Sequence, residues 1–303
     1  MTVSRASRAT SGATADALLL TIAVLAVSTS GPLVREADAP GMSIAFWRTF
    51  MGALVVIGIA AVRHRSELRS LHRKELRTAV VAGVFLGLHF STWIPSLSFT
   101  TVASSVALVC TQPVWAAVIA RGRGEHVAST AWAGIAVALC GVLVLTGVDL
   151  SVSGRALFGD ALALAGGVLA AAYVTAGSDA RRSMSTATYT SLCYSVAACG
   201  LLTACLLGRQ SLTGYDARTW WVLVAITVGP QLLGHTLVNR VLRTFTATVV
   251  SVAILFEIVG ATLIAWWWFD EAPPAGAYPA AALIALGVVL VVRASSAPAP
   301  AVE

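Results

Sequence analysis

The stretch Phe99–Val109, with the sequence FTTVASSVALV, has a second copy at Phe245–Leu255, with the sequence FTATVVSVAIL. A glycine and a histidine precede each copy, in Gly87-Leu88-His89 and in Leu233-Gly234-His235, and the register between the two slips by about one residue. A duplicated motif of this kind predicts a chain made of two related halves, residues 1–150 and residues 151–303.

The composition excludes most classes of protein. The 303 residues are 57% hydrophobic and only 11% charged, with a mean hydropathy of +0.83, whereas soluble domains carry about 25% charged residues. A soluble enzyme, a disordered chain and a fibrous protein are excluded. A helix needs about 20 apolar residues to cross a bilayer, and ten segments qualify, at 16–35, 42–62, 78–97, 101–120, 128–148, 157–177, 187–207, 218–238, 246–269 and 276–293. The sequence therefore predicts an all-α polytopic membrane protein with ten transmembrane helices.

The distribution of basic residues predicts the orientation. If the N-terminus is cytoplasmic, fifteen of the twenty lysines and arginines lie on the cytoplasmic side, four lie outside and Arg48 lies within a span. This asymmetry follows the positive-inside rule. We therefore expect a multi-pass protein of the cell inner (plasma) membrane with both termini in the cytoplasm. The same distribution accounts for the net charge of +6 without nucleic-acid binding.

The number of spans in each half predicts how the halves are related. Each half has five spans, and because five is odd, the second half must enter the membrane upside down. Inverted five-helix repeats are typical of carriers that open a midplane site to one side at a time. The five cysteines lie inside apolar runs without metal-ligand spacing, so no metal and no cofactor is predicted.

The chain resembles the EamA-type, ten-helix branch of the drug/metabolite transporter (DMT) superfamily. The residues that carry the resemblance are Pro40 to Arg48, Ala107 to Pro113 with Gly124-Glu125 after it, and Ser251 to Glu257 closed by Asp270-Glu271-Ala272-Pro273. The sequence departs from the family at Ile258, where a proline usually follows the glutamate. The resemblance implies a cavity lined by the first four helices of each half and a small-metabolite substrate. It also implies that the fifth and tenth helices support the bundle or a homodimer contact.

Charged groups inside the spans are the first candidates for a site, because burying one costs at least about 2.5 kcal/mol. Glu257 falls near the middle of the ninth span. It is expected to bind a proton or a substrate amine, or else to be a neutral or ion-paired structural group. Arg48 is expected to hold a substrate carboxylate, to form a structural pair, or to extend to the interface. Gln112 is the counterpart of Glu257 in the first half.

Histidines and aromatic residues complete the candidate site. His89 and His235 occupy matching places in the two halves and are expected either to shuttle protons or to hydrogen-bond a neighbouring helix. Phe90, Trp93 and Tyr173 are candidates for lining the cavity, although aromatic residues near span ends also anchor helices at the interface.

These features favour one function. We expect a carrier that exports an amino acid or a related small polar or amphipathic metabolite by alternating access, driven by protons or by the gradient of the substrate. An importer or a lipid-intermediate carrier of the same fold is the alternative. A membrane enzyme would need a clustered catalytic group, and the polar residues are scattered. We therefore expect no enzymatic activity.

Overall fold

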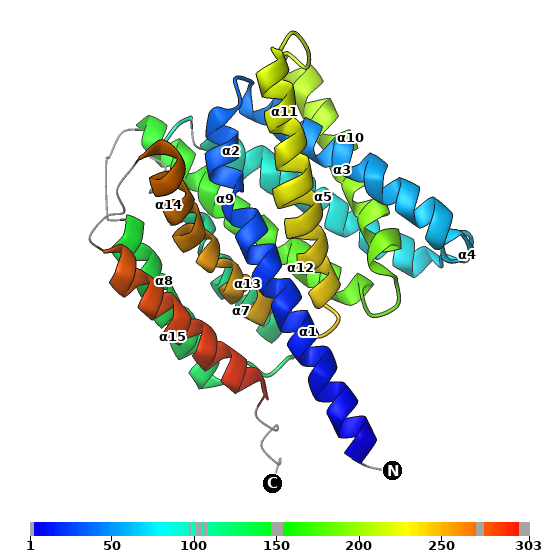
Figure 1. Ribbon diagram of the computed structural model, residues 1–303, viewed down its shortest axis with the longest axis vertical. Coiled ribbons are helices and arrows are strands. Elements are labelled where there is room, and N and C mark those ends of the chain that lie inside the picture. The colour runs from blue at the N-terminus through cyan, green and yellow to red at the C-terminus, as the bar shows by residue number, and fades with distance from the viewer. Residues whose placement is uncertain are drawn as a thin grey trace.

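The computed structural model describes residues 3–96, 98–100, 105, 108–146, 154–270 and 276–296, which form helices joined by short loops (Figure 1). The first half contains α1 (Val3–Ser28), α2 (Ser30–Glu36), α3 (Gly41–Arg63), α4 (Arg65–Arg69), α5 (Arg73–Ser96), α7 (Gln112–Gly122) and α8 (Ser129–Thr146). The second half contains α9 (Gly154–Ala180), α10 (Thr186–Leu207), α11 (Ala217–Ile226), the π-helix η1 (Thr227–His235), α12 (Thr236–Val241), α13 (Ala247–Ile254), α14 (Phe256–Phe269) and α15 (Ala277–Ser296).

The described helices confirm the prediction of a polytopic all-α membrane protein. Eight of them, including joined segments such as α11–η1–α12, are long and apolar enough to cross a membrane, and α8 is a shorter apolar helix. They coincide with nine of the predicted spans. Of the predicted span 101–120, the structure describes residue 105 and residues 108–120, and most of these belong to α7. Residues 101–104, 106–107 and 271–273 of the repeated motifs lie outside the described part of the chain.

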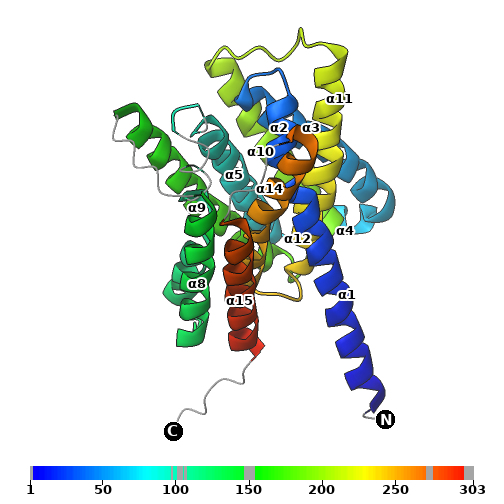
Figure 2. The same cartoon turned by 60° about the vertical axis from the view of Figure 1, so that its left-hand side comes forward.

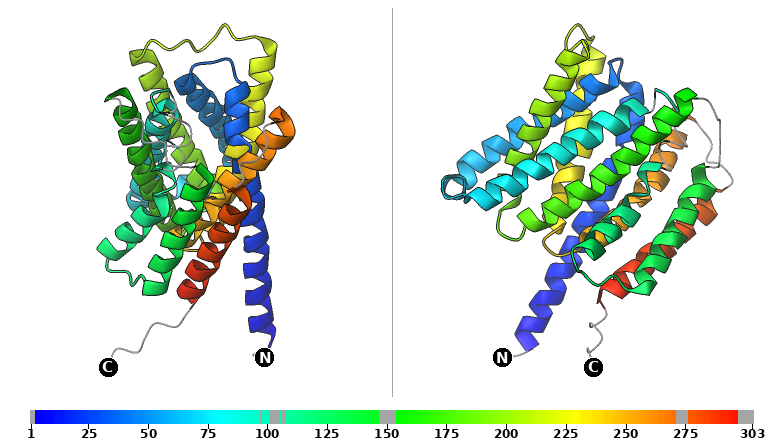
Figure 3. Two further views of the ribbon diagram at one scale, coloured as in Figure 1. Left: turned by 90° about the vertical axis from the view of Figure 1, so that its left-hand side faces the viewer. Right: turned by 180° about the vertical axis from the view of Figure 1, so that it is seen from behind.

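The helices pair in a pattern related by a pseudo-two-fold axis. Helix α5 of the first half packs along α9 of the second half, and the matching contact is that of η1 and α12 of the second half with α1 of the first. Two further helix pairs each join equivalent helices, α3 with α10 and α8 with α15, and the latter two lie side by side at the edge of the bundle (Figure 2). The long α1 begins, and α15 ends, at the same end of the molecule (Figure 3).

Two hydrogen-bonded pairs mark the symmetry residue by residue. At the end that carries both termini, Thr244 donates to Asp16. At the opposite end, the hydroxyl of Thr100 donates to Asp160, with 2.6 Å between the oxygens. Asp160 stands 144 residues after Asp16, and Thr244 stands 144 residues after Thr100. The same contact is thus made once at each end of the bundle, as inverted repeats require.

Small residues set the distance between α8 and α15. A Cβ atom at Gly287 would lie 2.5 Å from the carbonyl oxygen of Gly134 and 2.6 Å from the Cβ of Ala138. The backbones of the two helices therefore touch directly, which is how apolar helices associate where lipid offers no hydrophobic driving force.

We expect Gly287→Ala to destabilise the protein by about 1–3 kcal/mol, because the added methyl group overpacks the contact with α8. The measurement is the thermal unfolding midpoint in detergent. The matched control is Gly58→Ala in α3, where nothing lies within 4 Å of the added atom and where alanine improves helix propensity by up to about 1 kcal/mol. An equal rise in both midpoints would contradict this packing.

Candidate functional site

Arg48 is held inside the bundle by three neighbouring elements. Its side chain is 1% exposed. The Nε–H donates to Oε1 of Gln231 at 3.1 Å, and an Nη1–H donates to the hydroxyl of Ser30 at 3.2 Å. The guanidinium also lies over the ring of Phe90, 4.7 Å from its centroid, where the π face attracts a cation. Arg48 therefore stays within the protein and does not extend to the interface.

Gln231 is the main partner of Arg48, and the sequence-based prediction did not include it. It is completely buried in η1. Gly52 follows Arg48 by one helical turn, and a Cβ atom there would lie 2.8 Å from the Gln231 Cγ. A glycine at this place thus makes room for the amide. The sequence contained a signal, since Gln231 directly follows Gly229-Pro230 inside an apolar span. The structure adds a π-helix at this place, and π-helical turns are frequent at functional sites.

Arg48 and Gln231 each keep one hydrogen-bond donor without a partner. Because the Arg48 Nε–H needs an acceptor, Oε1 of Gln231 faces it and Nε2 points elsewhere. Among the described residues no acceptor reaches Nε2 of Gln231 or Nη2 of Arg48, and both atoms are buried. An unsatisfied buried donor costs about 1–3 kcal/mol, and a charged one costs more. The hydrogen-bonded pair of Arg48 and Gln231 therefore retains two buried donor atoms that are free to bind an acceptor.

Glu257 lies at a break in the ninth span. The α13 helix ends at Ile254, and α14 starts at Phe256 with Glu257 in its first turn. The break therefore forms although Ile258 replaces the usual proline. The side chain is half-buried, and within the described chain it has no hydrogen bond and no ion pair within 4 Å. It interacts electrostatically with Arg48, and a carboxylate is favoured at a helix N-terminus.

The fourth span has an equivalent break. The amide of Thr111 donates to Leu108, and that of Leu255 donates to Val252, both at 3.1 Å and 144 residues apart. Each turn is followed by a new helix, and Pro113 stands at the start of α7, where its missing N–H costs nothing.

Gln112 joins the two breaks. Its amide Nε2 donates to the hydroxyl of Ser251 in α13, at 2.9 Å. Gln112 is the first residue of α7, whereas Glu257 is the second residue of α14. Gln112 and Glu257 were expected to be counterparts, but Gln112 lies one residue closer to its helix break than Glu257 does.

The two histidines lie on the corresponding helices of the two halves. Nδ1 of His89 lies 2.9 Å from the carbonyl oxygen of Gly166, and because a carbonyl only accepts, this nitrogen carries the proton. The His89 ring stacks on Trp93 at 5.8 Å. His235 contacts Phe90 edge-to-face at 5.5 Å and lies 6.3 Å from the ring of Tyr173. The predicted aromatic residues thus gather around both histidines.

Two tyrosines bind the eighth span, Tyr173 at Asn239 and Tyr194 at the backbone of Gln231. The hydroxyl of Tyr173 accepts from Nδ2 of Asn239 at 2.6 Å. Tyr194, which the sequence-based prediction missed, is completely buried. Its hydroxyl lies 3.2 Å from that of Thr236 and donates to the Gln231 carbonyl at 3.5 Å. These contacts hold η1 against α9 and α10 and fix the backbone that carries Gln231.

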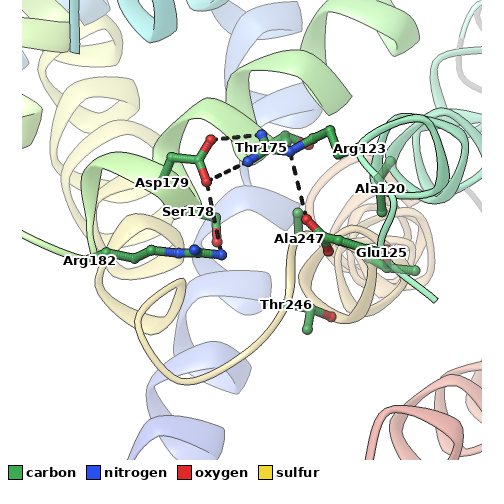
Figure 4. A pocket seen from close by; sticks show the side chains of 11 residues that line it. Ala120, Arg123, Glu125, Thr175, Ser178, Asp179, Arg182, Thr246 and Ala247 are labelled. Atoms are coloured by element: carbon green, nitrogen blue, oxygen red, sulfur yellow. Dashed lines mark hydrogen bonds and ion pairs between the residues drawn. The ribbon is translucent and has the colours of Figure 1, made fainter. Parts of the chain in front are cut away.

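A recess of about 70 Å³ lies at the end that carries the termini and contains none of the predicted site residues (Figure 4). Arg123 forms two hydrogen bonds with Asp179 there, at 2.7 and 2.9 Å. The bond to Asp179 raises the pKa of Arg123. Arg123 follows α7 and Asp179 lies at the end of α9, so this ion pair joins the two halves at that end.

Inverted repeats with paired broken helices and buried charges beside them define a class, the polytopic membrane carriers. The model of the EamA-like transporter family matches the chain twice, at residues 15–147 and 157–293. The chain belongs to the EamA-like transporter family, within the DMT superfamily, as the sequence motifs indicated.

A solved crystal structure is similar to this chain with a TM-score of 0.77 and 20% sequence identity, over 94% of this chain and 99% of that one. Because the sequence identity is only 20%, this structural similarity establishes a shared fold and nothing about function. No curated protein matches the chain at a significant level.

Proposed function

We propose that the protein is a secondary transporter that exports a small polar or amphipathic metabolite, such as an amino acid, by alternating access. Residues 1–150 and 151–303 are its two halves. The observation that carries the proposal is the pair of equivalent helix breaks, one in each half, with Glu257 at the second break, together with the buried Arg48 that Gln231 binds across the two halves. Buried charges at broken helices are the features by which secondary carriers bind solutes and coupling ions.

Paired contacts at the two ends support alternating access. We define the latches as the pair Asp16–Thr244 and the pair Asp160–Thr100. Each latch joins the first helix of one half to the loop before the ninth or the fourth span. A carrier of this kind opens one end while the other stays closed, so the latches are expected to release in turn.

The distribution of basic residues supports the orientation. Arg123, Arg182 and Arg240 lie at the end that carries both termini, and Arg155 lies at the opposite end. The positive-inside rule then puts the termini in the cytoplasm of a cell whose inner (plasma) membrane holds the protein. A homodimer would use α8 and α15, which lie at the edge of the bundle (Figure 2).

Thr244→Val and Thr100→Val are expected to release opposite ends, because valine keeps the shape of threonine and loses the hydroxyl. The measurement is labelling of Cys110, which is 9% exposed, in a background without the other four cysteines. A membrane-impermeant maleimide should react faster from the cytoplasmic side in Thr244→Val and faster from the outer side in Thr100→Val. The matched control is Thr203→Val, on an exposed face of α10. Faster labelling from the same side in both variants would contradict alternate release.

Glu257→Gln is expected to abolish the response of transport to a pH gradient, because the amide cannot exchange a proton. The measurement is amino-acid flux in reconstituted vesicles with and without a pH gradient. Glu75→Gln, in the first turn of α5 outside the apolar part of the span, is the matched control and should keep the response. Flux that stays equally coupled to the gradient in Glu257→Gln would remove the glutamate from the mechanism. Efflux from preloaded cells decides between export and import.

A further inference from the structure

The segment between α3 and α5, residues 63–77, carries the densest cluster of positive charge in the chain. All of its lysines and arginines are exposed, and in the described part of the chain none of them belongs to an ion pair. We call these residues the basic face: Arg63, Arg65, Arg69, Arg73, Lys74 and Arg77. Since no described carboxylate neutralises it, the basic face is free to attract an anionic partner.

The two acidic residues of the segment are bound elsewhere. Glu67, in α4, accepts a hydrogen bond of 2.6 Å from the backbone N–H of Ser185 and lies 3.2 Å from Nδ1 of His64. Glu75, in the first turn of α5, accepts a hydrogen bond of 3.0 Å from the backbone N–H of His72. The two acids thus stabilise the local structure, and the basic face keeps its charge.

The bond from Ser185 also fixes the position of the segment. Ser185 is the N-cap of α10 and follows α9, so Glu67 joins the segment to the second half of the chain. Leu71 packs against the core of the bundle. Because α9 ends near Asp179, the basic face lies at the end of the molecule that carries both termini, with α4 at the tip of the α3–α5 hairpin (Figure 1).

Exposed apolar side chains adjoin the basic face. Val62 is 84% exposed and precedes Arg63, and Leu76 is 44% exposed and precedes Arg77. Apolar side chains exposed on spanning helices face acyl chains, and long cationic side chains beside them reach the headgroups. This order of apolar and cationic groups matches a phospholipid, in which acyl chains are followed by a phosphate. A soluble anion would leave the apolar part without a partner.

The positive-inside rule does not require this arrangement. The rule depends on the number of basic residues near the ends of spans, and acidic residues contribute little to it. It is therefore satisfied whether or not Glu67 and Glu75 pair with the neighbouring arginines. That both acids bind backbone amides instead is a separate observation, and it leaves a charged surface at headgroup level.

We propose that the basic face binds the headgroups of anionic phospholipids in the leaflet at the end that carries the termini. Clusters of four to eight basic residues next to a spanning helix are typical of such binding, and each cation near an anionic lipid surface strengthens the attraction by up to about fivefold. The inference requires only that the protein spans a membrane and does not depend on the identity of a transported solute.

The test compares two lipids on the full-length protein in a neutral detergent. The protein is titrated with dioleoyl-phosphatidylglycerol or with dioleoyl-phosphatidylcholine, and the rise of the thermal unfolding midpoint gives an apparent Kd, because a ligand that binds the native state stabilises it. We expect the Kd of the anionic lipid to be at least about tenfold lower, and the difference to shrink in high salt, which screens exposed charges. Equal Kd values at low salt would overturn the proposal.

A third titration separates a lipid from a free phosphate. Glycerol 3-phosphate carries the same phosphate chemistry without acyl chains, and we expect it to bind at least about tenfold more weakly than phosphatidylglycerol. Equally tight binding would assign the basic face to a soluble anion and overturn the assignment to lipid.

A triple variant tests which cations are responsible. Arg65→Gln, Arg69→Gln and Arg73→Gln together remove half of the basic face, and they should lower the preference for phosphatidylglycerol at least about fivefold. Lysine at the same three positions keeps the charge and should retain the preference. Both variants bear exposed substitutions, and their unfolding midpoints without lipid monitor folding. An unchanged preference in the glutamine variant would overturn the proposal.

The matched control removes the same charge from the same end of the molecule, at three separate exposed positions. It combines Arg121→Gln, Arg243→Gln and Arg293→Gln. We expect its preference for phosphatidylglycerol to stay within about twofold of that of the unchanged protein. An equal loss in this control would assign the effect to net charge and overturn the basic face as a docking surface.

Discussion

The burial of the Arg48 guanidinium is the constraint on which the centre of the molecule depends. A charge in the hydrocarbon region is costly unless protein groups replace its water. Ser30, Phe90 and Gln231 supply that environment from three different helices. The requirement explains why Gly52 lies where the Gln231 side chain must approach. Loss of any of these contacts would leave a buried charge less well solvated.

The polar contacts between the two halves in the centre of the bundle use residues from both. Gln112 of the first half binds Ser251 of the second half, and Arg48 of the first binds Gln231 of the second. A displacement of one half against the other must therefore change hydrogen bonds in the centre. Since such bonds have discrete partners, the centre and the ends of the bundle are expected to change together.

The fold could be predicted from the sequence because apolar length and a repeated motif are local properties. The all-α class, the family and the nine predicted spans that the described helices match were all visible in this way. The site was predicted only in part. Arg48 and Glu257 stood out because charge is rare in an apolar span, whereas Gln231 and Tyr194 are uncharged. Both residues stand out only through their contacts with other helices, and a hydropathy pattern contains no information about such contacts.

Equivalent residues of the two halves lie 144 residues apart in the structure, and the sequence motif alone did not give this spacing. The repeated motif aligns the two halves with an offset of 146 residues, as between Phe99 and Phe245, whereas the Asp–Thr pairs and the helix breaks have an offset of 144 residues. An exact alignment of the halves by sequence alone would therefore misplace Gln112 against Glu257. The equivalence of residues in the two halves is given by their hydrogen bonds, which cannot be read from the sequence.

Closing both ends with the same pair of side chains has an energetic consequence. In the proposed alternating-access mechanism, aspartate and threonine that seal either end with similar strength would leave the inward-facing and outward-facing forms close in free energy. The balance between them then depends on groups present at one end only, such as Arg240, which lies 3.4 Å from Asp16. A single arginine at the rim would in this way set the resting orientation of the molecule.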